Sequence, residues 1–389
     1  MLPFRSNEYV VDELIDWMAV PDDPIFRLTF PQPDMLAEPD LNRMVDLLRR
    51  EANAGEVRAA ANEIRLGLSP HPGGQVELNT PRLEGDNLTG MQHKYPETLL
   101  FFPRQGQTCH AYCTYCFRWP QFVGEPSMKM ATDDVDALCS YLSAHPEITS
   151  VLITGGDPLV MSADVLARYV EPLLDKRFES LESIRIGTKA LSYWPYRFVS
   201  DPDADDLLRL FERVVASGKH LALMAHFSHP NELAPQVARD ALRRVRETGA
   251  VVRCQAPLIR GVNDDAAVWA DMWRRLTRFG AVPYYMFVER DTGPKDYFAV
   301  PLARAYEIFR DAYRQVSGLA RTVRGPIMSA TPGKVMVDGI ANVADQEVFV
   351  LHFVQARNPD LVNRPFFAKL DPSAVWLSDL EPAFGAFPF

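Results

Sequence analysis

The chain has 389 residues, which suits one large domain with extensions or two domains. Apolar residues make up 47% of it, charged residues 24%, and 41 basic against 51 acidic side chains leave a formal net charge of −10. The acidic balance argues against a broad nucleic-acid surface, which needs basic groups against phosphates. No apolar run approaches the roughly 18 residues that span a bilayer, and the start, MLPFRSNEYVVDELIDWM, has no signal-peptide core. We therefore expect a cytoplasmic protein that binds neither nucleic acid nor membrane.

The first part of the chain, residues 1–94, is expected to form a mostly helical extension. Apolar residues recur at helical spacing over Leu41–Ala61. The stretch that follows, 69-SPHPGGQVELNTP-81, is rich in proline and glycine, which predicts a loop.

From residue 98 onwards, short apolar runs alternate with amphipathic helical segments. We expect strands in the runs 98–103, 150–156, 183–189, 220–227, 251–258 and 281–288, and helices over Asp133–Ala144, Asp203–Ala216, Pro235–Glu247 and Ala266–Phe279. After the first, the runs begin every 30–37 residues, the period of a βα unit. Six such units with near-continuous apolar strands predict a parallel sheet covered by helices. The sheet would be either doubly wound or a barrel, and a barrel of six units would be open on one side. The tail over residues 325–354 predicts short antiparallel strands with turns.

Polar or unusual residues follow the predicted strands, at the carboxyl ends where parallel sheets bind ligands. They are Arg104, Gly155-Gly156-Asp157, Thr188-Lys189, His226 to His229, Gln255 and Glu289-Arg290-Asp291. Packing alone would not place six such groups at six strand ends, so we expect a ligand site there. Asn263 and Asp264 are expected to cap the helix after the fifth strand.

Three of the five cysteines, Cys109, Cys113 and Cys116, fall within eight residues at the spacing C-x3-C-x2-C. An odd number of clustered cysteines is not a disulfide framework, and in a reducing compartment it indicates a metal site. Thiolates at this spacing can converge on a soft metal centre. One option is a structural zinc that also takes His110 or a distant fourth ligand. The other is an iron–sulfur cluster held by three thiolates, with one iron open for a ligand. Three unligated buried cysteines are the alternative that the clustering disfavours.

The two remaining cysteines, Cys139 on a predicted helix and Cys254 within a predicted strand, are expected to be ordinary core residues.

The cysteine motif, placed after the first strand of a βα series and followed by an aromatic residue, resembles the radical S-adenosylmethionine (SAM) superfamily. The resemblance implies a partial (β/α)6 TIM-like barrel over residues 95–320, with an N-terminal helical extension over 1–94 and a β-containing C-terminal extension over 321–389. It also implies that the three cysteines hold a 4Fe-4S cluster whose fourth iron binds SAM. Reductive cleavage of SAM then yields methionine and a 5′-deoxyadenosyl radical, which abstracts a hydrogen from the substrate.

The glycine-rich element of that superfamily is present after the second strand as 151-VLITGGDPL-159. The resemblance implies that Gly155, Gly156 and Asp157 contact the amino group of SAM. Glycines there let the backbone approach a ligand closely.

Further motifs resemble the lysine 2,3-aminomutase branch over roughly residues 90–340. They are 90-GMQHKYPETLLFF-102, the cysteine loop through Arg118, TGGD, 184-IRIGT-188, 225-AHFSHPNE-232, 255-QAPLIRGVNDD-265, 283-PYYMFV-288 and 332-PGK-334. In that branch SAM works with pyridoxal 5′-phosphate (PLP), to which the substrate's amino group becomes attached, and nitrogen migrates from Cα to Cβ. The resemblance thus implies an amino-acid isomerase that takes electrons from a donor such as flavodoxin or ferredoxin. It leaves a homo-oligomer open.

Individual residues of this chain match functional residues of the lysine 2,3-aminomutase branch. Lys334 matches the lysine that binds PLP, and Tyr95 matches a tyrosine on the PLP face. His226 and Gln255 match residues that line the SAM and PLP site. Arg118 matches the arginine that binds the substrate carboxylate, which suits the paired donors of a guanidinium. The alternatives are a solvated lysine in a hairpin turn for Lys334 and a structural salt bridge for Arg118.

One departure from the branch concerns the phosphate of PLP. The branch has an arginine three residues beyond the tyrosine that helps hold this phosphate, and here that position is Thr98. A neighbouring basic group such as Lys94 or Arg104 would have to substitute. The glycine-rich run before Lys334 is also shortened, to ATPGK.

A second departure concerns the substrate. Lysine-specific members use two aspartates to bind the distant ammonium of lysine. Here Arg290 stands at one of these positions, and the segment 323-VRGPIMSATP-332 contains no acid at the other. An arginine favours a carboxylate or another polar acceptor, so we expect a 2,3-aminomutase for an amino acid other than lysine, with Arg118 and Arg290 binding the substrate. A shift of one or two residues that brings Glu289 or Asp291 into place is the alternative.

Two rival functions remain open from the sequence. One is a PLP-independent radical SAM enzyme acting on another substrate, in which Lys334 would be a surface residue. The other is a non-catalytic zinc or iron–sulfur protein built on a βα sheet, in which TGGDPL and HFSHPNE at strand ends would have no evident purpose.

Overall fold

The structure is a computed structural model that describes residues 2–68, 78–122 and 129–389. Most of the predicted loop 69–81 lies outside these residues. The strands are β1 (Arg82–Leu83), β2 (Asp86–Asn87), β3 (Met91–Tyr95), β4 (Thr98–Phe101), β5 (Ser150–Ile153), β6 (Ser183–Thr188), β7 (His220–His226), β8 (Val251–Leu258), β9 (Val282–Val288), β10 (Arg324–Ser329), β11 (Gly333–Val343), β12 (Gln346–Ala356) and β13 (Pro365–Lys369). The α-helices are α1 (Pro24–Thr29), α2 (Glu38–Arg49), α3 (Ala54–Gly67), α5 (Trp119–Phe122), α6 (Val135–Ala144), α7 (Ala163–Val170), α8 (Ala190–Tyr193), α9 (Ala204–Ala216), α10 (Gln236–Glu247), α11 (Ala266–Arg278), α12 (Lys295–Phe298) and α13 (Leu302–Arg314).

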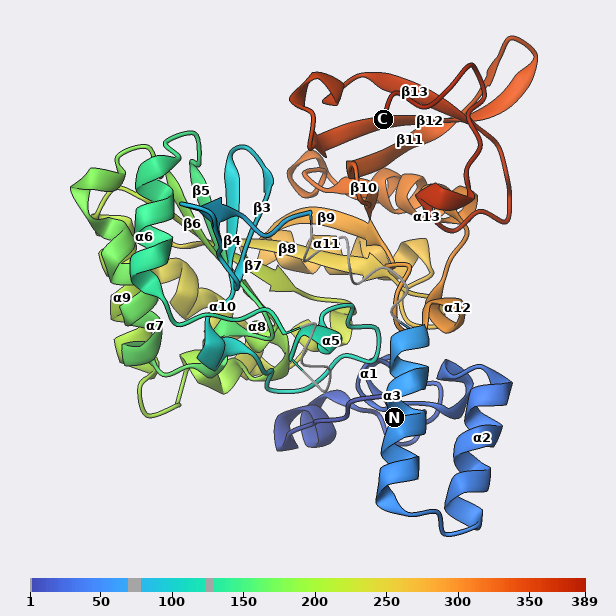
Figure 1. The fold of residues 1–389 in the computed structure, drawn as a ribbon, viewed down its shortest axis with the longest axis horizontal. Coiled ribbons are helices and arrows are strands. Elements are labelled where there is room, and N and C mark those ends of the chain that lie inside the picture. Colours follow the sequence, from blue (N-terminus) through green and yellow to red (C-terminus); the bar gives the residue numbers. More distant parts are fainter. Residues whose placement is uncertain (1, 69–77, 123–128) are drawn as a thin grey trace.

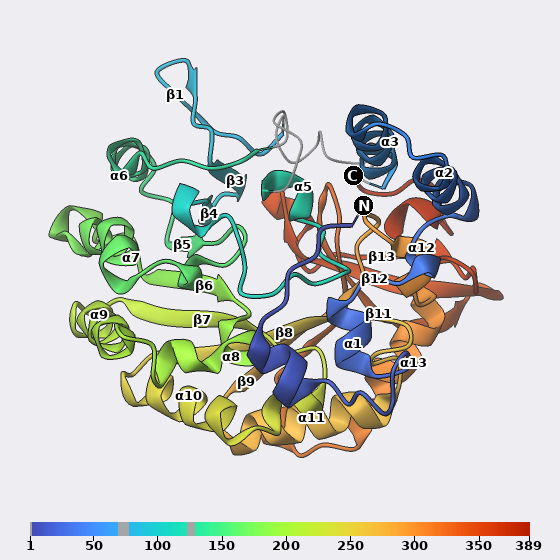
Figure 2. The ribbon, with the colours of Figure 1, turned by 90° about the horizontal axis from the view of Figure 1, so that it is seen from below.

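Six parallel strands, β4 to β9, form the middle of an eleven-stranded sheet. Each of them coincides with a predicted apolar run. Strands that follow one another in the chain are also neighbours in the sheet. A doubly wound sheet reverses its strand order at one point, and this sheet does not, so it winds in one direction into a partial barrel. Figure 2 shows the helices α6, α7, α9, α10 and α11 along the outer side of this curved sheet. The expected (β/α)6 arrangement is therefore present.

The inner side of the barrel is polar. Along β6 and β8, fully buried residues alternate with partly exposed ones. The buried ones, such as Ile184 and Val252, belong to the core beneath the helices. The partly exposed positions on the other side of the same strands include Arg185, Arg253 and Gln255. A closed barrel fills its interior with branched apolar side chains, so polar side chains here indicate an interior that holds a ligand.

The sheet continues beyond the six strands at both ends. β3 pairs antiparallel with β4, so the N-terminal extension contributes a strand as well as helices. At the other end β10 pairs parallel with β9, and β11, β12 and β13 form an antiparallel meander. The prediction that residues 325–354 form only antiparallel strands is thus wrong for β10, which joins the barrel sheet before the chain turns back.

The C-terminal strands contact the opposite end of the sheet. Lys94 Nζ donates a hydrogen bond of 2.5 Å to the carbonyl oxygen of Ala330, and Gln355 Nε2 donates one of 2.6 Å to Glu97. These contacts connect β3 and the turn before β4 with the segment around β11 and β12. The C-terminal extension therefore closes part of the opening that six βα units leave.

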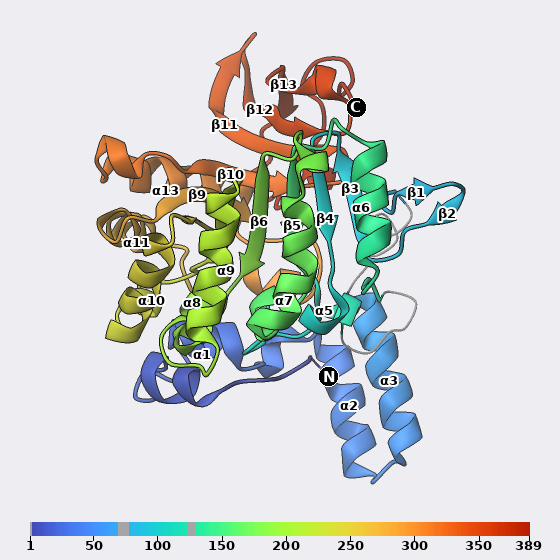
Figure 3. The ribbon, with the colours of Figure 1, turned by 90° about the vertical axis from the view of Figure 1, so that its left-hand side faces the viewer.

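The N-terminal helices α1, α2 and α3 lie on the other side of the barrel from the C-terminal strands, as Figures 1 and 3 show. Leu41–Ala61 forms two antiparallel helices, α2 and α3, rather than one helical stretch. The break occurs because Glu51 adopts a left-handed conformation (φ 51°) and Asn53 caps α3 by accepting hydrogen bonds from the backbone of Gly55 and Glu56. No helix among the described residues is long and apolar enough to cross a membrane.

The predicted cap of the helix after the fifth strand is wrong. The α11 cap is Asp265, whose carboxylate accepts from the backbone of Ala267. Asn263 is fully buried and instead connects the backbone of Ile259 with that of Ser228, which joins the loop after β8 to the loop after β7.

Candidate functional site

The cysteine loop follows β4 and is buried by two other parts of the chain. Cys109, Cys113 and Cys116 are free thiols, and burial raises the pKa of each of them. Neighbouring cysteines raise the pKa of Cys109 and Cys116 further, to about 12 for Cys116. The raised pKa values mean that the three thiols stay protonated at neutral pH unless a cation lies beside them. The iron ions of a cluster would supply that positive charge.

The three cysteines fit the cluster that the sequence predicts. In the described part of the chain, no three Cys, His, Asp or Glu side chains form a group that could hold a metal ion. A three-thiolate cluster needs no such convergence on one ion, because its cysteines bind three different irons. Cys139 and Cys254 are buried in the main core, as predicted.

The N-terminal segment covers the cysteine loop. The backbone carbonyl of Arg5 accepts from the backbone of Tyr112, and Asn7 donates to the carbonyl oxygen of His110 at 3.2 Å. Farther along, the carbonyl oxygen of Leu28 accepts from the backbone of Thr114. These contacts hold the N-terminal segment against the loop.

The glycine-rich turn after β5 packs directly against the start of the cysteine loop. A Cβ on Gly155 (φ +142°) would lie 2.2 Å from Gln107 Nε2, and one on Gly156 would lie 2.3 Å from the carbonyl oxygen of Thr108. The Asp157 backbone also donates to this oxygen, at 2.6 Å. The two glycines are needed here because a side chain would push the two loops apart.

The carboxylate of Asp157 is buried and already has several donors. It accepts hydrogen bonds from Thr188 Oγ1 at 2.8 and 2.9 Å, and from the backbone of Lys189 and Leu159 at 2.8 and 3.0 Å. Burial raises the pKa of this carboxyl group. Asp157 therefore joins the turn after β5 to the end of β6.

His226 and Gln255 lie together on neighbouring strands. They are register partners on β7 and β8, and Gln255 Nε2 lies 2.9 Å from His226 Nε2. Burial, with the charges of Lys189 and Arg118 nearby, lowers the pKa of His226 to about 3. The ring is therefore neutral, and its Nε2 accepts the hydrogen bond from the Gln255 amide.

The two arginines predicted to bind substrate also lie together. The guanidinium carbons of Arg118 and Arg290 are 5.0 and 4.7 Å from the ring centroid of Phe117. Arg290 Nη1 donates to the carbonyl oxygen of Ser329 at 2.5 Å. Burial lowers the pKa of Arg118 to about 10, because the charged form loses water, while nearby Cys116 raises it. Arg290 thus joins the end of β9 to the segment that precedes Lys334.

Lys334 is half-buried and belongs to strand β11, so it is not a solvated lysine in a hairpin turn. Its Nζ lies 5.4 Å from the ring centroid of Tyr95 and 5.3 Å from that of Tyr285. Burial lowers its pKa to about 7, assisted by the charges of Arg185 and Arg324. A lysine with this pKa is partly neutral near pH 7, and the neutral amine can attack a carbonyl group, as a PLP lysine must.

The sequence analysis missed two partners of this lysine, Gln355 and Tyr285. Gln355 pairs with Lys334 across the β11–β12 hairpin, and its Oε1 accepts from Lys334 Nζ at 2.5 Å. The sequence carries no strong signal for this hairpin, because its two left-handed turn residues are Ala344 and Asp345 rather than the Asn-Gly or Asp-Gly that such turns favour.

Several buried polar atoms in the described part of the chain have no hydrogen-bond partner. Tyr95 Oη and Arg185 Nε belong to residues near Lys334, and Arg290 Nε belongs to a residue near Tyr95. An unsatisfied buried polar group costs on the order of 1–3 kcal/mol. These atoms therefore fit a polar ligand such as PLP with its substrate.

Of the two basic residues suggested as substitutes for the missing phosphate arginine, Arg104 is wrong. Its side chain is 61% exposed and pairs with Asp133 at 3.2 Å outside the barrel. Lys94 lies near the site, 5.3 Å from the ring centroid of Tyr95. Burial, with the charges of Arg357, Arg290 and Lys334, lowers the pKa of Lys94 to about 7.

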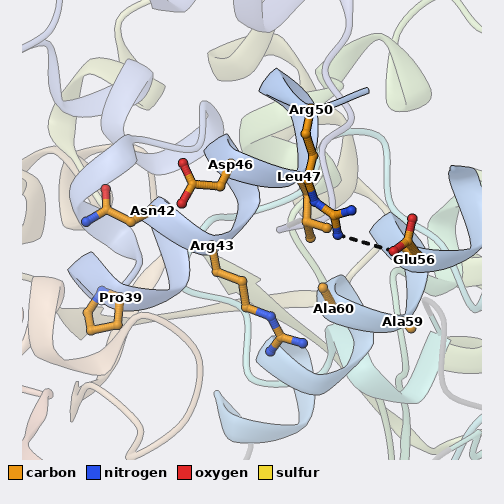
Figure 4. A pocket seen from close by; sticks show the side chains of 9 residues that line it. All are labelled: Pro39, Asn42, Arg43, Asp46, Leu47, Arg50, Glu56, Ala59 and Ala60. Atoms are coloured by element: carbon orange, nitrogen blue, oxygen red, sulfur yellow. Dashed lines mark hydrogen bonds and ion pairs between the residues drawn. The ribbon is translucent and has the colours of Figure 1, made fainter. Parts of the chain in front are cut away.

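A pocket of about 680 Å³ lies between α2 and α3. Figure 4 shows that both charged and uncharged side chains line it, with Arg50 and Glu56 paired at 3.2 Å. This hairpin projects away from the barrel (Figure 3), so the pocket is separate from the cysteines and Lys334.

Comparison with known proteins identifies relatives along almost the whole chain, although no family model matches. The chain is 34% identical over 377 residues to an Aquifex aeolicus protein named "Putative L-lysine 2,3-aminomutase", covering 97% of this chain and 87% of that one. It is 25% identical over 308 residues to the L-lysine 2,3-aminomutase of Fusobacterium nucleatum, covering 72% and 68%. Among solved structures, a radical SAM methyltransferase from Sphaerobacter thermophilus matches with a TM-score of 0.41 and 18% identity over 64% of this chain and 71% of that one. The chain belongs to the lysine 2,3-aminomutase family of radical SAM isomerases.

Proposed function

We propose that the protein is a PLP-dependent radical SAM 2,3-aminomutase that moves an amino group from Cα to Cβ of an amino acid other than lysine, preferably an acidic one. The observation that carries this proposal is the position of Arg290. It lies beside Arg118 across the ring of Phe117 and donates to Ser329, in the acid-free segment before Lys334. A guanidinium repels the ammonium of lysine and attracts a carboxylate.

In this proposal Cys109, Cys113 and Cys116 hold the 4Fe-4S cluster, and the backbone of Gly155 and Gly156 lines the place of SAM beside the cysteine loop. The cluster and SAM, when bound, supply the 5′-deoxyadenosyl radical after reduction by a donor such as flavodoxin or ferredoxin. The chain itself positions SAM and excludes water.

His226 and Gln255 complete the SAM side of the interior in this proposal. The neutral His226 ring and the Gln255 amide offer hydrogen-bonding groups without adding charge beside Arg118. A neutral pair is suitable here because SAM is already a cation, and a further positive charge would repel it.

Lys334 binds PLP in this proposal, and the ring of Tyr95 lies on one side of it. PLP, when bound, supplies the electronic stabilisation that lets nitrogen migrate. Gln355 orients the lysine amine, and burial lowers its pKa to about 7, so that a large fraction of it is neutral near that pH. The rival function without PLP expects Lys334 at the surface, whereas the side chain is half-buried between Tyr95, Tyr285 and Gln355.

Arg118 binds the α-carboxylate of the substrate, and Arg290 binds the group at the end of its side chain. Both guanidinium groups are buried, so each binds a carboxylate more strongly than it would in water.

Incubation of the reconstituted enzyme with SAM, reductant, PLP and a panel of amino acids tests the proposal. The expected product is the β-isomer of an acidic or neutral amino acid. β-Lysine as the sole product would contradict the proposal. The Arg290→Asp variant is the matched comparison, because it restores the acidic residue that lysine-specific members have at this position.

A further inference from the structure

Three arginines project into the barrel from different strands and meet on a pair of tyrosines. Arg324 Cζ lies 4.8 and 4.4 Å from the ring centroids of Tyr284 and Tyr285, and Arg253 Cζ lies 5.2 Å from that of Tyr284. Arg185 is close enough to both tyrosines and to Arg253 for their charges to act on it. The three residues stand in the amino-terminal halves of β6, β8 and β10.

Carboxylates do not neutralise this arginine cluster. Within residues 2–68, 78–122 and 129–389, the structure gives none of the three an ion pair, and Arg185 Nε has no hydrogen-bond partner at all. Glu97 is the acid whose charge reaches Arg185, and its side chain is held by Gln355 at 2.6 Å. Three buried or half-buried cations with so little compensation repel one another, and a bound anion would remove that repulsion.

The arginine cluster also lies next to Thr98 and Lys334, the two positions that concern PLP binding. Arg185 Nη2 donates to Thr98 Oγ1 at 3.4 Å, and Thr98 stands where the family's phosphate-binding arginine is missing. The charges of Arg185 and Arg324 act directly on Lys334. The cluster therefore lies beside the PLP lysine, whereas Arg118 and Arg290 flank Phe117 near the cysteine loop.

We propose that Arg185, Arg253 and Arg324 form a binding site for a phosphate monoester, which in the holoenzyme is the phosphate of PLP. This inference rests on the proposed function for the identity of the ligand. Three guanidinium groups suit a phosphate dianion, which offers more acceptor oxygens and more charge than a carboxylate. In this arrangement Arg185 takes over the place beside Thr98, and the substrate carboxylates remain with Arg118 and Arg290.

Binding of PLP and of pyridoxal, which lacks the phosphate, tests the site without measuring catalysis. Dissociation constants are taken from the absorbance change when each compound attaches to the purified protein. The variants are Arg324→Gln and Arg253→Gln, whose described contacts are with tyrosine rings, and the matched control is Arg104→Gln, at an exposed arginine outside the barrel. Arg324→Lys checks whether charge alone suffices, and circular dichroism with melting temperature checks the fold of each variant.

We expect the wild type and Arg104→Gln to prefer PLP over pyridoxal strongly. Each cluster variant should weaken PLP on the order of 10- to 100-fold and leave pyridoxal nearly unchanged. Equal losses for the two compounds in a folded variant, or an unchanged preference for PLP, would overturn the site.

Inorganic phosphate separates this inference from the proposed function. If the wild type binds no PLP, the PLP-dependent function fails. Phosphate that then raises the melting temperature of the wild type but not of Arg324→Gln still supports the anion site. Phosphate that raises neither, in a protein that binds no PLP, overturns the site as well.

Discussion

Lys334 Nζ donates a hydrogen bond of 2.5 Å to Oε1 of Gln355, its partner across the β11–β12 hairpin. The other end of the same amide, Nε2, donates to the carboxylate of Glu97 at 2.6 Å. Glu97 therefore fixes which way the amide of Gln355 points, because a carboxylate accepts and cannot donate when ionised. The amide in turn holds the lysine amine next to Tyr95 without supplying a negative charge.

Attachment of PLP to Lys334 should be half-complete near pH 7, and not near the higher pH that corresponds to the ordinary pKa of a lysine side chain. Burial and neighbouring arginines lower the pKa of Lys334 to about 7, so the neutral amine increases as the pH rises through that value. Absorbance of bound PLP measured from pH 5.5 to 9 checks this. Lys334→Met should show no such absorbance at any pH, and attachment that begins only above pH 9 would contradict the assignment.

Replacing Gln355 by glutamate should move that profile to higher pH. Gln355→Glu, combined with Glu97→Gln so that two carboxylates do not share one proton, places a carboxylate beside Lys334 Nζ, and an opposite charge at hydrogen-bond distance favours the protonated amine. We expect the midpoint to rise by about 1 unit or more. Gln355→Met, which removes the hydrogen bond without adding charge, is the comparison, and an equal shift in both variants would show that charge is not the cause.

Loss of one cysteine of the cluster should remove iron and SAM cleavage together. Cys113→Ala leaves two thiolates, so anaerobically reconstituted protein should lose most of its iron and form no 5′-deoxyadenosine from SAM and dithionite. Cys254→Ala is the matched control, because this thiol is buried in the core away from the cluster loop. Iron content and SAM cleavage that survive in Cys113→Ala would remove the basis of the proposed chemistry.

A methyl group on Gly156 should disturb the cluster loop. In Gly156→Ala the new Cβ would lie 2.3 Å from the carbonyl oxygen of Thr108, so the cysteine loop must move. We expect iron incorporation to fall several-fold and the protein to be destabilised by about 1–3 kcal/mol in urea titrations. Gly318→Ala, where nothing lies within 4 Å, should match the wild type in both measurements.

Arg290 should affect substrate binding more than radical formation. Arg290→Gln removes a buried guanidinium but leaves the cluster loop intact, so the KM for an acidic substrate should rise on the order of 10- to 100-fold, as loss of a charge-assisted contact predicts. SAM cleavage without substrate should be unchanged. A variant that loses substrate binding and SAM cleavage to the same extent would indicate that Arg290 supports the fold instead.

Local sequence pattern was sufficient for the strands and for the cluster loop. The six apolar runs became β4 to β9, and the four predicted helices begin and end within two residues of their predicted bounds, whereas no bounds were predicted for α7 and α8. Such elements follow from burial on a period of 2 or 3.6 residues, which neighbouring residues alone specify. The grouping of Cys109, Cys113 and Cys116 is likewise local, because a short loop brings them together whatever the rest of the chain does.

The neighbours of Lys334 were decided only by the tertiary structure. Glu97 and Gln355 are 258 residues apart in the chain, and Arg185 and Thr98 are 87 apart. Glu97 and Gln355 meet because the curved sheet brings its two ends together, and curvature is a property of the whole sheet that no local pattern encodes. Arg185 and Thr98 meet across the single strand β5 that separates β6 from β4. The sequence by itself thus determined the βα series, the cysteine loop and the family resemblance. Closure of the sheet determined which charges surround Lys334, and therefore its lowered pKa.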